Sequence, residues 1–231
     1  MGRTVGVLHT SFVFVTVEPV FRDLFAELLP DVKVVDFVDS DVLAAVRRVG
    51  RVTPPAVRRM CHLAQAAEAA GVDVIFSACS SLGPALDVAR KLVEVPVVKV
   101  DDAMAEQAVE LAAAIGVLAT VPTTLGPTAD LVLEKAARAG RPVTVQPRLC
   151  EGAFDILMSG RRDEHDAMVL AAARELATEV ELIVLAQASM GRLSPSLAEA
   201  TGIPVLSSPR LGVEQLARVI RELDAAAPAA T

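Results

Sequence analysis

The sequence predicts an α/β protein of two related lobes, each a mainly parallel sheet flanked by helices. Short runs rich in Val, Ile and Leu alternate along the chain with longer segments of helical periodicity. The short runs lack the apolar–polar alternation of a half-exposed strand, which is typical of strands buried on both faces of a parallel sheet. In addition, the second half of the chain repeats part of the first.

Eight short apolar runs are predicted to be strands. In chain order they are Val5–Thr10, Val32–Val38, Val72–Ala78, Val95–Val100, Ile115–Thr120, Val143–Pro147, Glu181–Ala186 and Val205–Ser208. Apolar residues recur with helical spacing between them, which predicts helices over Pro55–Ala70, Ala103–Ala113, Thr128–Ala139 and His165–Val180. The steps Gly126-Pro127 and Leu82-Gly83-Pro84 are interpreted as turns and helix starts.

The internal repeat runs without a gap over 38 residues. When the chain is shifted by 108 positions, Val72–Val109 lies on Val180–Ala217 with nine identities. Gly6-Val7-Leu8 is echoed by Gly116-Val117-Leu118 at a shift of 110. The Gly, Pro and Val usage common to all βα units is the alternative explanation, but two related Rossmann-like lobes account better for the match. We expect residues 1–100 with 208–231 to form lobe one and 101–207 to form lobe two, with the active site in a crevice at their strand ends.

Composition and charge limit the partners and the location. The formal net charge of −7 and the lack of Trp and Tyr argue against a nucleic-acid partner, because phosphate is repelled and stacking platforms are scarce. The longest uncharged run, Leu111–Ala129, contains Pro122 and Pro127, so we expect a strand, a turn and a helix start there and no membrane span. No secretory signal is visible, and three cysteines without paired spacing suit a reducing cytoplasm.

Motifs for prosthetic groups are missing from the sequence. No zinc-ligand spacing, P-loop or GxGxxG occurs, so neither a metal nor a nucleotide cofactor is expected. The sequence leaves self-association into a homo-oligomer open.

A cysteine follows the third predicted strand. Cys79 precedes a helix start, where free N–H groups and the helix dipole favour a thiolate, whereas most free cysteines are simply small buried hydrophobes. The matching position in the second lobe is Gln187. Hydroxyl groups near these and other strand ends offer donors to a substrate carboxylate; they belong to Thr10, Ser11, Ser80, Ser81, Thr120, Thr123, Thr124 and Ser189.

The two-lobe plan opens each half with Gly-Val-Leu, at Gly6-Val7-Leu8 and at Gly116-Val117-Leu118, and places Ala78-Cys79-Ser80-Ser81 after a buried strand. In these features the chain resembles the aspartate/glutamate racemase superfamily. That superfamily includes amino-acid and hydantoin racemases, maleate isomerases and arylmalonate decarboxylases. The resemblance implies a cofactor-independent enzyme that moves a proton next to the carboxylate of a small acid or amino acid, through an enediolate. It also implies that Cys79 is one of two cysteines, one per lobe, that face each other across the substrate.

The second cysteine of that pair falls on Gln187, which cannot ionise. Either another residue supplies the second proton, or the reaction is a decarboxylation, an isomerisation or a hydrolysis, with Gln187 stabilising an oxyanion. A small-carboxylate binding protein without chemistry is the alternative outside enzymes.

Two further candidates come from the same resemblance. His9 stands before Thr10 where glutamate racemases carry an Asp before a Ser, so it is a candidate thiolate partner of Cys79 or second acid/base. A purely structural role in the loop is the alternative for His9. Glu151 follows a strand near where some racemases place an active-site carboxylate, and a solvated helix residue is its alternative.

The remaining cysteines and histidine are weaker candidates. Cys61 lies in a helical pattern and is expected in the core, whereas Cys150 lies in a loop from which it could reach the crevice. His165 belongs to the charged stretch Arg161–Asp166, which is interpreted as a solvated turn and helix start.

Overall fold

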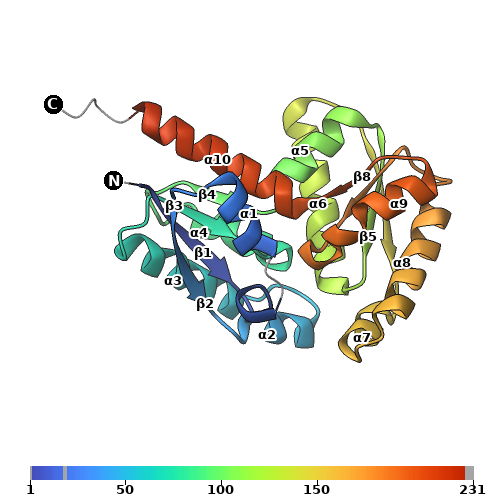
Figure 1. Cartoon of the computed structure of the whole chain (residues 1–231), viewed down its shortest axis with the longest axis horizontal. Helices are drawn as coiled ribbons and strands as arrows, with labels where there is room; N and C mark the ends of the chain where they lie inside the picture. The colour runs from blue at the N-terminus through green and yellow to red at the C-terminus, as the bar shows by residue number, and fades with distance from the viewer. Residues whose placement is uncertain (1, 18–19, 227–231) are drawn as a thin grey trace. The chain divides into compact units, whose positions relative to one another are not determined.

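The computed structural model describes residues 2–17 and 20–226, and it divides the chain into two compact units (Figure 1). Unit 1 comprises the chain up to Val100 together with the stretch from Pro209 onward, and unit 2 comprises Asp101–Ser208. The return from unit 2 to unit 1 therefore lies one residue beyond the expected position. No described helix combines the length and the apolar character needed to span a bilayer.

Unit 1 contains a four-stranded parallel sheet with the order β2-β1-β3-β4. Its strands are β1 (Thr4–His9), β2 (Lys33–Val38), β3 (Val74–Ser77) and β4 (Val97–Lys99). The helical elements are η1 (Val13–Val17), α1 (Val20–Leu28), α2 (Val42–Val49), α3 (Pro54–Ala69), η2 (Ser80–Leu82), α4 (Gly83–Ala89) and α10 (Ser208–Ala226). All four expected strands of this unit are confirmed.

The two faces of this sheet bury different side chains, because successive residues of a strand point to opposite faces. Leu8 and Ile75 pack with residues of α2, α3 and α4 in one cluster. On the other face Phe76 of β3 makes edge-to-face contacts with Phe21 and Phe25 of α1, with ring centroids 5.6 and 5.8 Å apart. Helix α1 therefore covers the face opposite to α3.

Unit 2 repeats the same architecture with a parallel sheet of order β6-β5-β7-β8. Its strands are β5 (Ala114–Ala119), β6 (Thr144–Leu149), β7 (Leu182–Leu185) and β8 (Val205–Ser207). Its helical elements are α5 (Asp102–Leu111), α6 (Pro122–Ala139), α7 (Ala153–Met158), α8 (Arg162–Leu176), η3 (Ala188–Leu193) and α9 (Ser194–Thr201). The other four expected strands are thus confirmed as well.

The two copies of the internal repeat pair their strands in the same register. Gly6 of β1 pairs with Ile75, and Gly116 of β5 pairs with Ile183, the residue 108 positions after Ile75. Likewise Ile75 pairs with Val97 and Ile183 pairs with Val205. The two units therefore share one topology and one register, as the sequence match predicts.

Two expectations about helices are wrong. Helix α6 begins at Pro122 and continues through Pro127, so Gly126-Pro127 is no helix start. Gly126 has no Cβ to clash with the proline ring, which lowers the cost of Pro127 inside the helix. The helix still loses the hydrogen bond that Pro127 cannot donate, and the ring crowds the carbonyl one turn earlier. His165 is buried, with 1% of its surface exposed, rather than solvated, because it begins the inward-facing stripe of α8.

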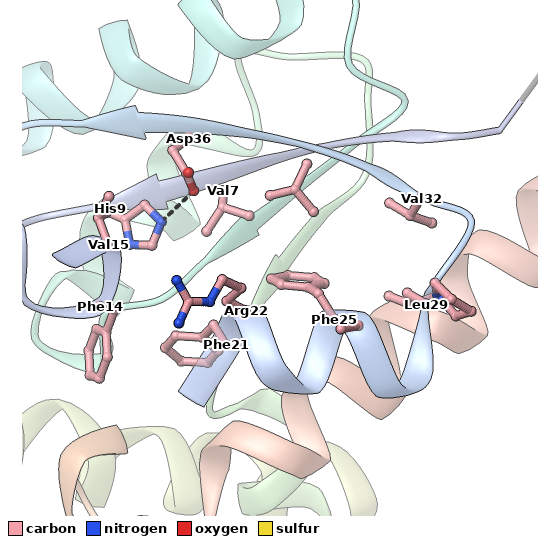
Figure 2. A pocket seen from close by; sticks show the side chains of 13 residues that line it. Val7, His9, Phe14, Val15, Phe21, Arg22, Phe25, Leu29, Val32 and Asp36 are labelled. Atoms are coloured by element: carbon pink, nitrogen blue, oxygen red, sulfur yellow. Dashed lines mark hydrogen bonds and ion pairs between the residues drawn. The ribbon is translucent and has the colours of Figure 1, made fainter. Parts of the chain in front are cut away.

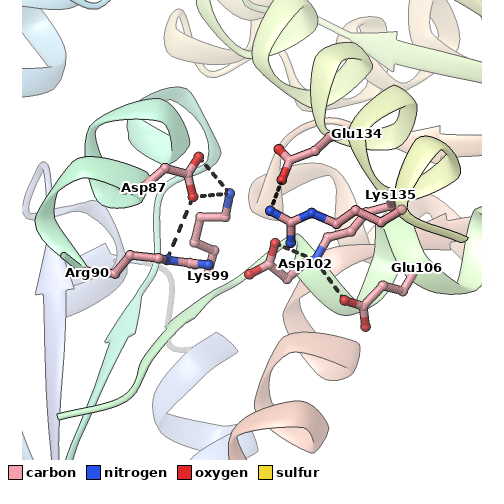
Figure 3. A network of polar contacts seen from close by, with 8 residues as sticks. Asp87, Arg90, Lys99, Asp102, Glu106, Glu134 and Lys135 are labelled. Carbon is pink, nitrogen blue, oxygen red and sulfur yellow. Dashed lines mark hydrogen bonds and ion pairs between the residues drawn. The ribbon is translucent and has the colours of Figure 1, made fainter. Parts of the chain in front are cut away.

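Buried lysines hold helices in place within each unit (Figure 3). In unit 1 the Nζ of Lys99, at the end of β4, lies 3.0 Å from Asp87 Oδ1 of α4. In unit 2 the Nζ of Lys135 on α6 lies 3.1 Å from Asp102 and 2.7 Å from Glu106, both on α5. Burial by itself lowers the pKa of Lys135, but these two carboxylates outweigh it and raise that pKa above its usual value.

Candidate active site

Cys79 lies two residues beyond the end of β3 in an extended conformation, with φ −136° and ψ 110°, and η2 and α4 begin beyond it. The side chain is partly exposed at the edge of the cluster that Leu8 and Ile75 share with α2, α3 and α4. Cys61 and Cys150 are buried instead, and burial raises the pKa of both thiols. Of the three cysteines, Cys79 is therefore the one that solvent and a substrate can reach.

Hydroxyl groups lie at the same end of the unit 1 sheet as Cys79. Strand β1 runs beside β3, with Leu8 opposite Ser77, so Thr10 and Ser11 leave the sheet at the same edge as Cys79. Ser80 and Ser81 follow Cys79 and are buried, as is Thr10. The expected hydroxyl donors of unit 1 thus gather at one end of its sheet.

His9 turns to the other face of β1. Its Nε2 lies 2.9 Å from Asp36 Oδ1 on the neighbouring strand β2, and the ring is buried with 3% of its surface exposed. Since strand residues alternate, His9 shares a face with Val7, whereas Leu8 packs in the cluster that Cys79 borders. The ring bonds Asp36 rather than the thiol, which supports the structural alternative for His9. Asp36 was not predicted from the sequence, although an acidic residue within an apolar strand is a signal that could have indicated it.

Gln187 occupies in unit 2 the position of Cys79 in unit 1. It lies two residues beyond the end of β7, and its buried side chain reaches the end of β5. Its Oε1 accepts three hydrogen bonds, from the Thr120 N–H at 2.7 Å, the Thr120 hydroxyl at 3.1 Å and the Val121 N–H at 3.1 Å. Because two of these donors are backbone amides, the side-chain oxygen must face them and the NH₂ group must face away.

These hydrogen bonds change the role that was expected for the Thr120 hydroxyl. Its hydroxyl has a single proton, which it donates to Gln187, so it cannot also donate to a substrate carboxylate. Thr124 likewise donates its hydroxyl proton to the Val121 carbonyl at 2.8 Å. These hydrogen bonds leave the Gln187 NH₂ group and the Ser189 hydroxyl as candidate donors among the described residues at this end of unit 2. The part expected of Thr123 stays a prediction.

The other candidate residues differ in how far their side chains are exposed to solvent. Ser189 is partly exposed although its repeat partner Ser81 is buried. Glu151 is exposed in the turn before α7, as its solvated alternative predicts, although outside the helix itself. The expectation that Cys150 reaches a crevice is wrong, because its side chain packs into the core of unit 2 with Leu118 and Val169. Among the described residues, no three His, Cys, Asp or Glu side chains gather as metal ligands would.

Comparison with known proteins places the chain in a family. The family model described as Asp/Glu/Hydantoin racemase matches residues 24–216. The chain belongs to the Asp/Glu/hydantoin racemase family. It is accordingly an enzyme of the racemase-like isomerase type. A search of curated protein sequences finds no significant match.

Solved structures of this family share the fold. A glutamate racemase from Bacillus anthracis superposes with a TM-score of 0.75 at 14% identity, covering 96% of this chain and 82% of that one. A glutamate racemase from Francisella tularensis, solved in complex with D-glutamate, gives 0.73 at 17% identity, covering 96% and 82%. An arylmalonate decarboxylase gives 0.59 at 16% identity, covering 94% and 92%.

Proposed function

We propose that this protein transfers a proton at the carbon next to a carboxylate of a small acid or amino acid, without a cofactor, and that Cys79 is its acid/base. The observation that carries the proposal is the partial exposure of Cys79 at a strand end, in a chain whose other two thiols are buried. The N–H groups of the helical turns that begin after Cys79 favour its thiolate form. A thiolate there removes a proton from the substrate carbon, and the thiol returns one.

The substrate carboxylate is held in this proposal by hydroxyl and backbone N–H groups rather than by Arg or Lys. Thr10, Ser11, Ser80 and Ser81 supply these donors beside Cys79, and Thr123 and Ser189 supply them in unit 2. His9 is left out of the reaction because it lies on the face of β1 opposite to the cluster that Cys79 borders.

Gln187 is proposed to stabilise the negative charge that develops on the substrate. Its NH₂ group is oriented by the three hydrogen bonds that hold its Oε1. Donors fixed in advance lower the cost of forming an enediolate, because they need no reorganisation during the reaction. An amide cannot supply a proton to carbon, so Cys79 protonates one face only.

Decarboxylation is the second candidate, and the engaged amide of Gln187 favours it over racemisation. In that reaction the bond between carbon and one carboxylate of a malonate-type substrate breaks, releasing CO₂ and leaving an enediolate. The Cys79 thiol then gives its proton to the carbon, and the resulting thiolate takes up a proton from water. One thiol is sufficient for this cycle, whereas a two-base racemisation needs a second group that changes its protonation state.

Turnover of a substrate panel in heavy water tests the proposal. The panel contains both enantiomers of glutamate and aspartate, hydantoins and substituted malonates; glutamate is included because a structural relative was solved with D-glutamate. We expect deuterium at the reacting carbon with a single configuration, loss of turnover in Cys79→Ala, and a large but measurable fall in kcat/KM in Cys79→Ser. Cys150→Ala, which removes a buried thiol, is the matched control and should retain turnover. Turnover that survives Cys79→Ala would refute the acid/base role.

A double-substitution cycle tests whether Cys79 and Gln187 act on one substrate. If they do, the effects of Cys79→Ser and Gln187→Glu on kcat/KM are not additive, since both act on the same transition state. Additive effects would contradict a shared substrate.

A further inference from the structure

Unit 1 contains a cavity of about 290 Å³ beneath α1, on the sheet face opposite to the cluster that Cys79 borders (Figure 2). It runs along β1 and β2 from His9 and Asp36 at one end to Leu29 and Val32 at the other. Its volume is at the lower end of the range for small-molecule sites, about 300 Å³ and above. The cavity is partly open to solvent rather than closed, so a ligand can enter it.

The walls of this cavity are apolar over most of its length. They are formed by Val7, Phe14, Val15, Phe21, Phe25, Ala26, Leu29, Pro30, Val32 and Val34. Phe14 and Phe21 meet edge to face with ring centroids 5.0 Å apart, so aromatic edges and faces are presented at one end. A ligand for this space must carry an apolar tail, and an aromatic ring suits the exposed aromatic surface.

One end of the cavity holds a buried polar atom without a partner. His9 Nε2 is occupied by Asp36, whereas His9 Nδ1 is buried and has no hydrogen-bond partner among the described residues. Because a carboxylate only accepts hydrogen bonds, Nε2 carries the proton between them. A buried polar atom left unpaired is destabilising, and a ligand head group beside Nδ1 would relieve that cost.

A cationic side chain lies at the same end. Figure 2 shows the guanidinium of Arg22 on the side of the cavity where the His9 ring lies. Arg22 is largely exposed, and within the described part of the chain its ion pair to Asp23 is long at 3.9 Å. A carboxylic acid satisfies both groups at once, since its oxygens accept from the guanidinium fork and the proton that it brings moves to Nδ1, which then donates to the carboxylate. The charges of Asp36, protonated His9, Arg22 and the carboxylate then balance.

We propose that this cavity binds a monocarboxylic acid with an aromatic or branched aliphatic tail, at a site separate from that of Cys79. The carboxylate lies between Arg22 and His9, and the tail lies along Phe21, Phe25 and Val34. This site belongs to unit 1 alone and does not depend on the proposed reaction.

Calorimetric titration with 4-phenylbutyrate and its neutral analogue 4-phenylbutan-1-ol tests the site. We expect the acid to bind the wild-type protein at least about tenfold more tightly than the alcohol, because a charged hydrogen bond is worth that much. Arg22→Gln should abolish this preference while leaving the alcohol's affinity unchanged. Arg58→Gln, an exposed arginine on α3 and so beneath the opposite face, is the matched control and should bind as wild type does.

Two further variants locate the bound acid. Ala26→Phe, at an exposed position of α1 that lines the cavity, should fill the space and remove binding of both compounds. Cys79→Ala should bind the acid normally. Lack of binding to wild type, normal binding to Ala26→Phe, or loss of binding in Cys79→Ala would each overturn the proposal. Circular dichroism of each variant verifies folding, and the exposed Arg22→Gln tests the head group even if Ala26→Phe fails to fold.

Discussion

At the scale of single residues, the three thiols differ in their exposure to solvent. Cys79 is partly exposed at a strand end, whereas Cys61 and Cys150 lie in the cores of units 1 and 2. Burial raises the pKa of both core thiols, so at neutral pH they hold less of the reactive thiolate.

We therefore predict that iodoacetamide at neutral pH alkylates Cys79 first. Peptide mapping over a time course should find Cys79 modified well before Cys61 and Cys150, which react only when the protein unfolds. Labelling in denaturant serves as the control, since all three thiols should then react at similar rates. Early modification of Cys150 with Cys79 untouched would contradict the assignment.

Gln187 combines two roles that substitutions can separate. Gln187→Ala leaves the Thr120 and Val121 donors without their acceptor, and we expect a loss of about 2–4 kcal/mol in the free energy of unfolding. Gln187→Glu keeps an acceptor for all three donors, which favour a carboxylate, so its stability should stay near that of wild type.

The same Gln187→Glu variant replaces the NH₂ donor by a negatively charged oxygen. We expect kcat/KM for a carboxylate substrate to fall by about tenfold or more, from the lost donor and the added repulsion. Urea unfolding and steady-state kinetics provide the two measurements. A Gln187→Glu enzyme with unchanged kinetics would show that the amide does not contact the substrate.

At the scale of elements, the strands were predictable and some helix features were not. Buried parallel strands are continuous apolar runs, and all eight appear where such runs occur. The start of α6 was placed too late because Pro127 normally ends or begins a helix. His165 was misread because its neighbours are charged, although its spacing with Val169, Ala173 and Leu176 is that of one helix face.

Repeat-related glycines offer a prediction at this scale. A Cβ on Gly116 would lie 2.7 Å from Leu176 Cδ2 and 2.9 Å from its Cγ, where α8 packs on β5. On Gly6 the nearest atoms would be Val72 Cγ1 at 3.1 Å and Ala67 Cβ at 3.2 Å. We expect Gly116→Ala to lower the free energy of unfolding by about 1–3 kcal/mol, and Gly6→Ala to cost less.

Chemical denaturation of the two glycine variants measures this difference. The wild-type protein, unfolded under the same conditions, is the control. Equal losses for Gly6→Ala and Gly116→Ala would mean that Leu176 moves aside without cost.

At the scale of the whole molecule, the sequence predicted which strand ends of the two units correspond, but not which hydrogen bonds the side chains at those ends make. The repeat matched Cys79 with Gln187, and both follow equivalent strands. The bond from Thr120 to Gln187 joins residues 67 positions apart and depends on rotamers that no pattern encodes. The pairing of His9 with Asp36 requires the β1–β2 register, which periodicity alone does not supply.

Acid stability is a property of the whole molecule, since both units tie carboxylates to arginines. In unit 2 the hydrogen bond from Arg192 lowers the pKa of Asp166. In unit 1 burial alone would raise the pKa of Asp39, but Arg59 and the backbone N–H groups of Asp41 and Val42 lower it overall. The same balance of burial against hydrogen bonds, from Thr4 and Arg3, lowers the pKa of Asp73.

A carboxyl group with a lowered pKa in the folded state stabilises the fold above its unfolded pKa, about 3.9, and loses that contribution as the pH falls through the folded value. We therefore predict that stability is steady from neutral pH down to about pH 5 and falls below it as these carboxylates gain protons. Circular dichroism with urea unfolding at each pH measures the profile. Arg192→Gln and Arg59→Gln should each remove about 1 kcal/mol at neutral pH. They should remove less at about pH 3, which lies below the unfolded pKa, because protonation of the unfolded chain has already cancelled part of the contribution there. Equal losses at both pH values would mean that these arginines act through packing and not through charge.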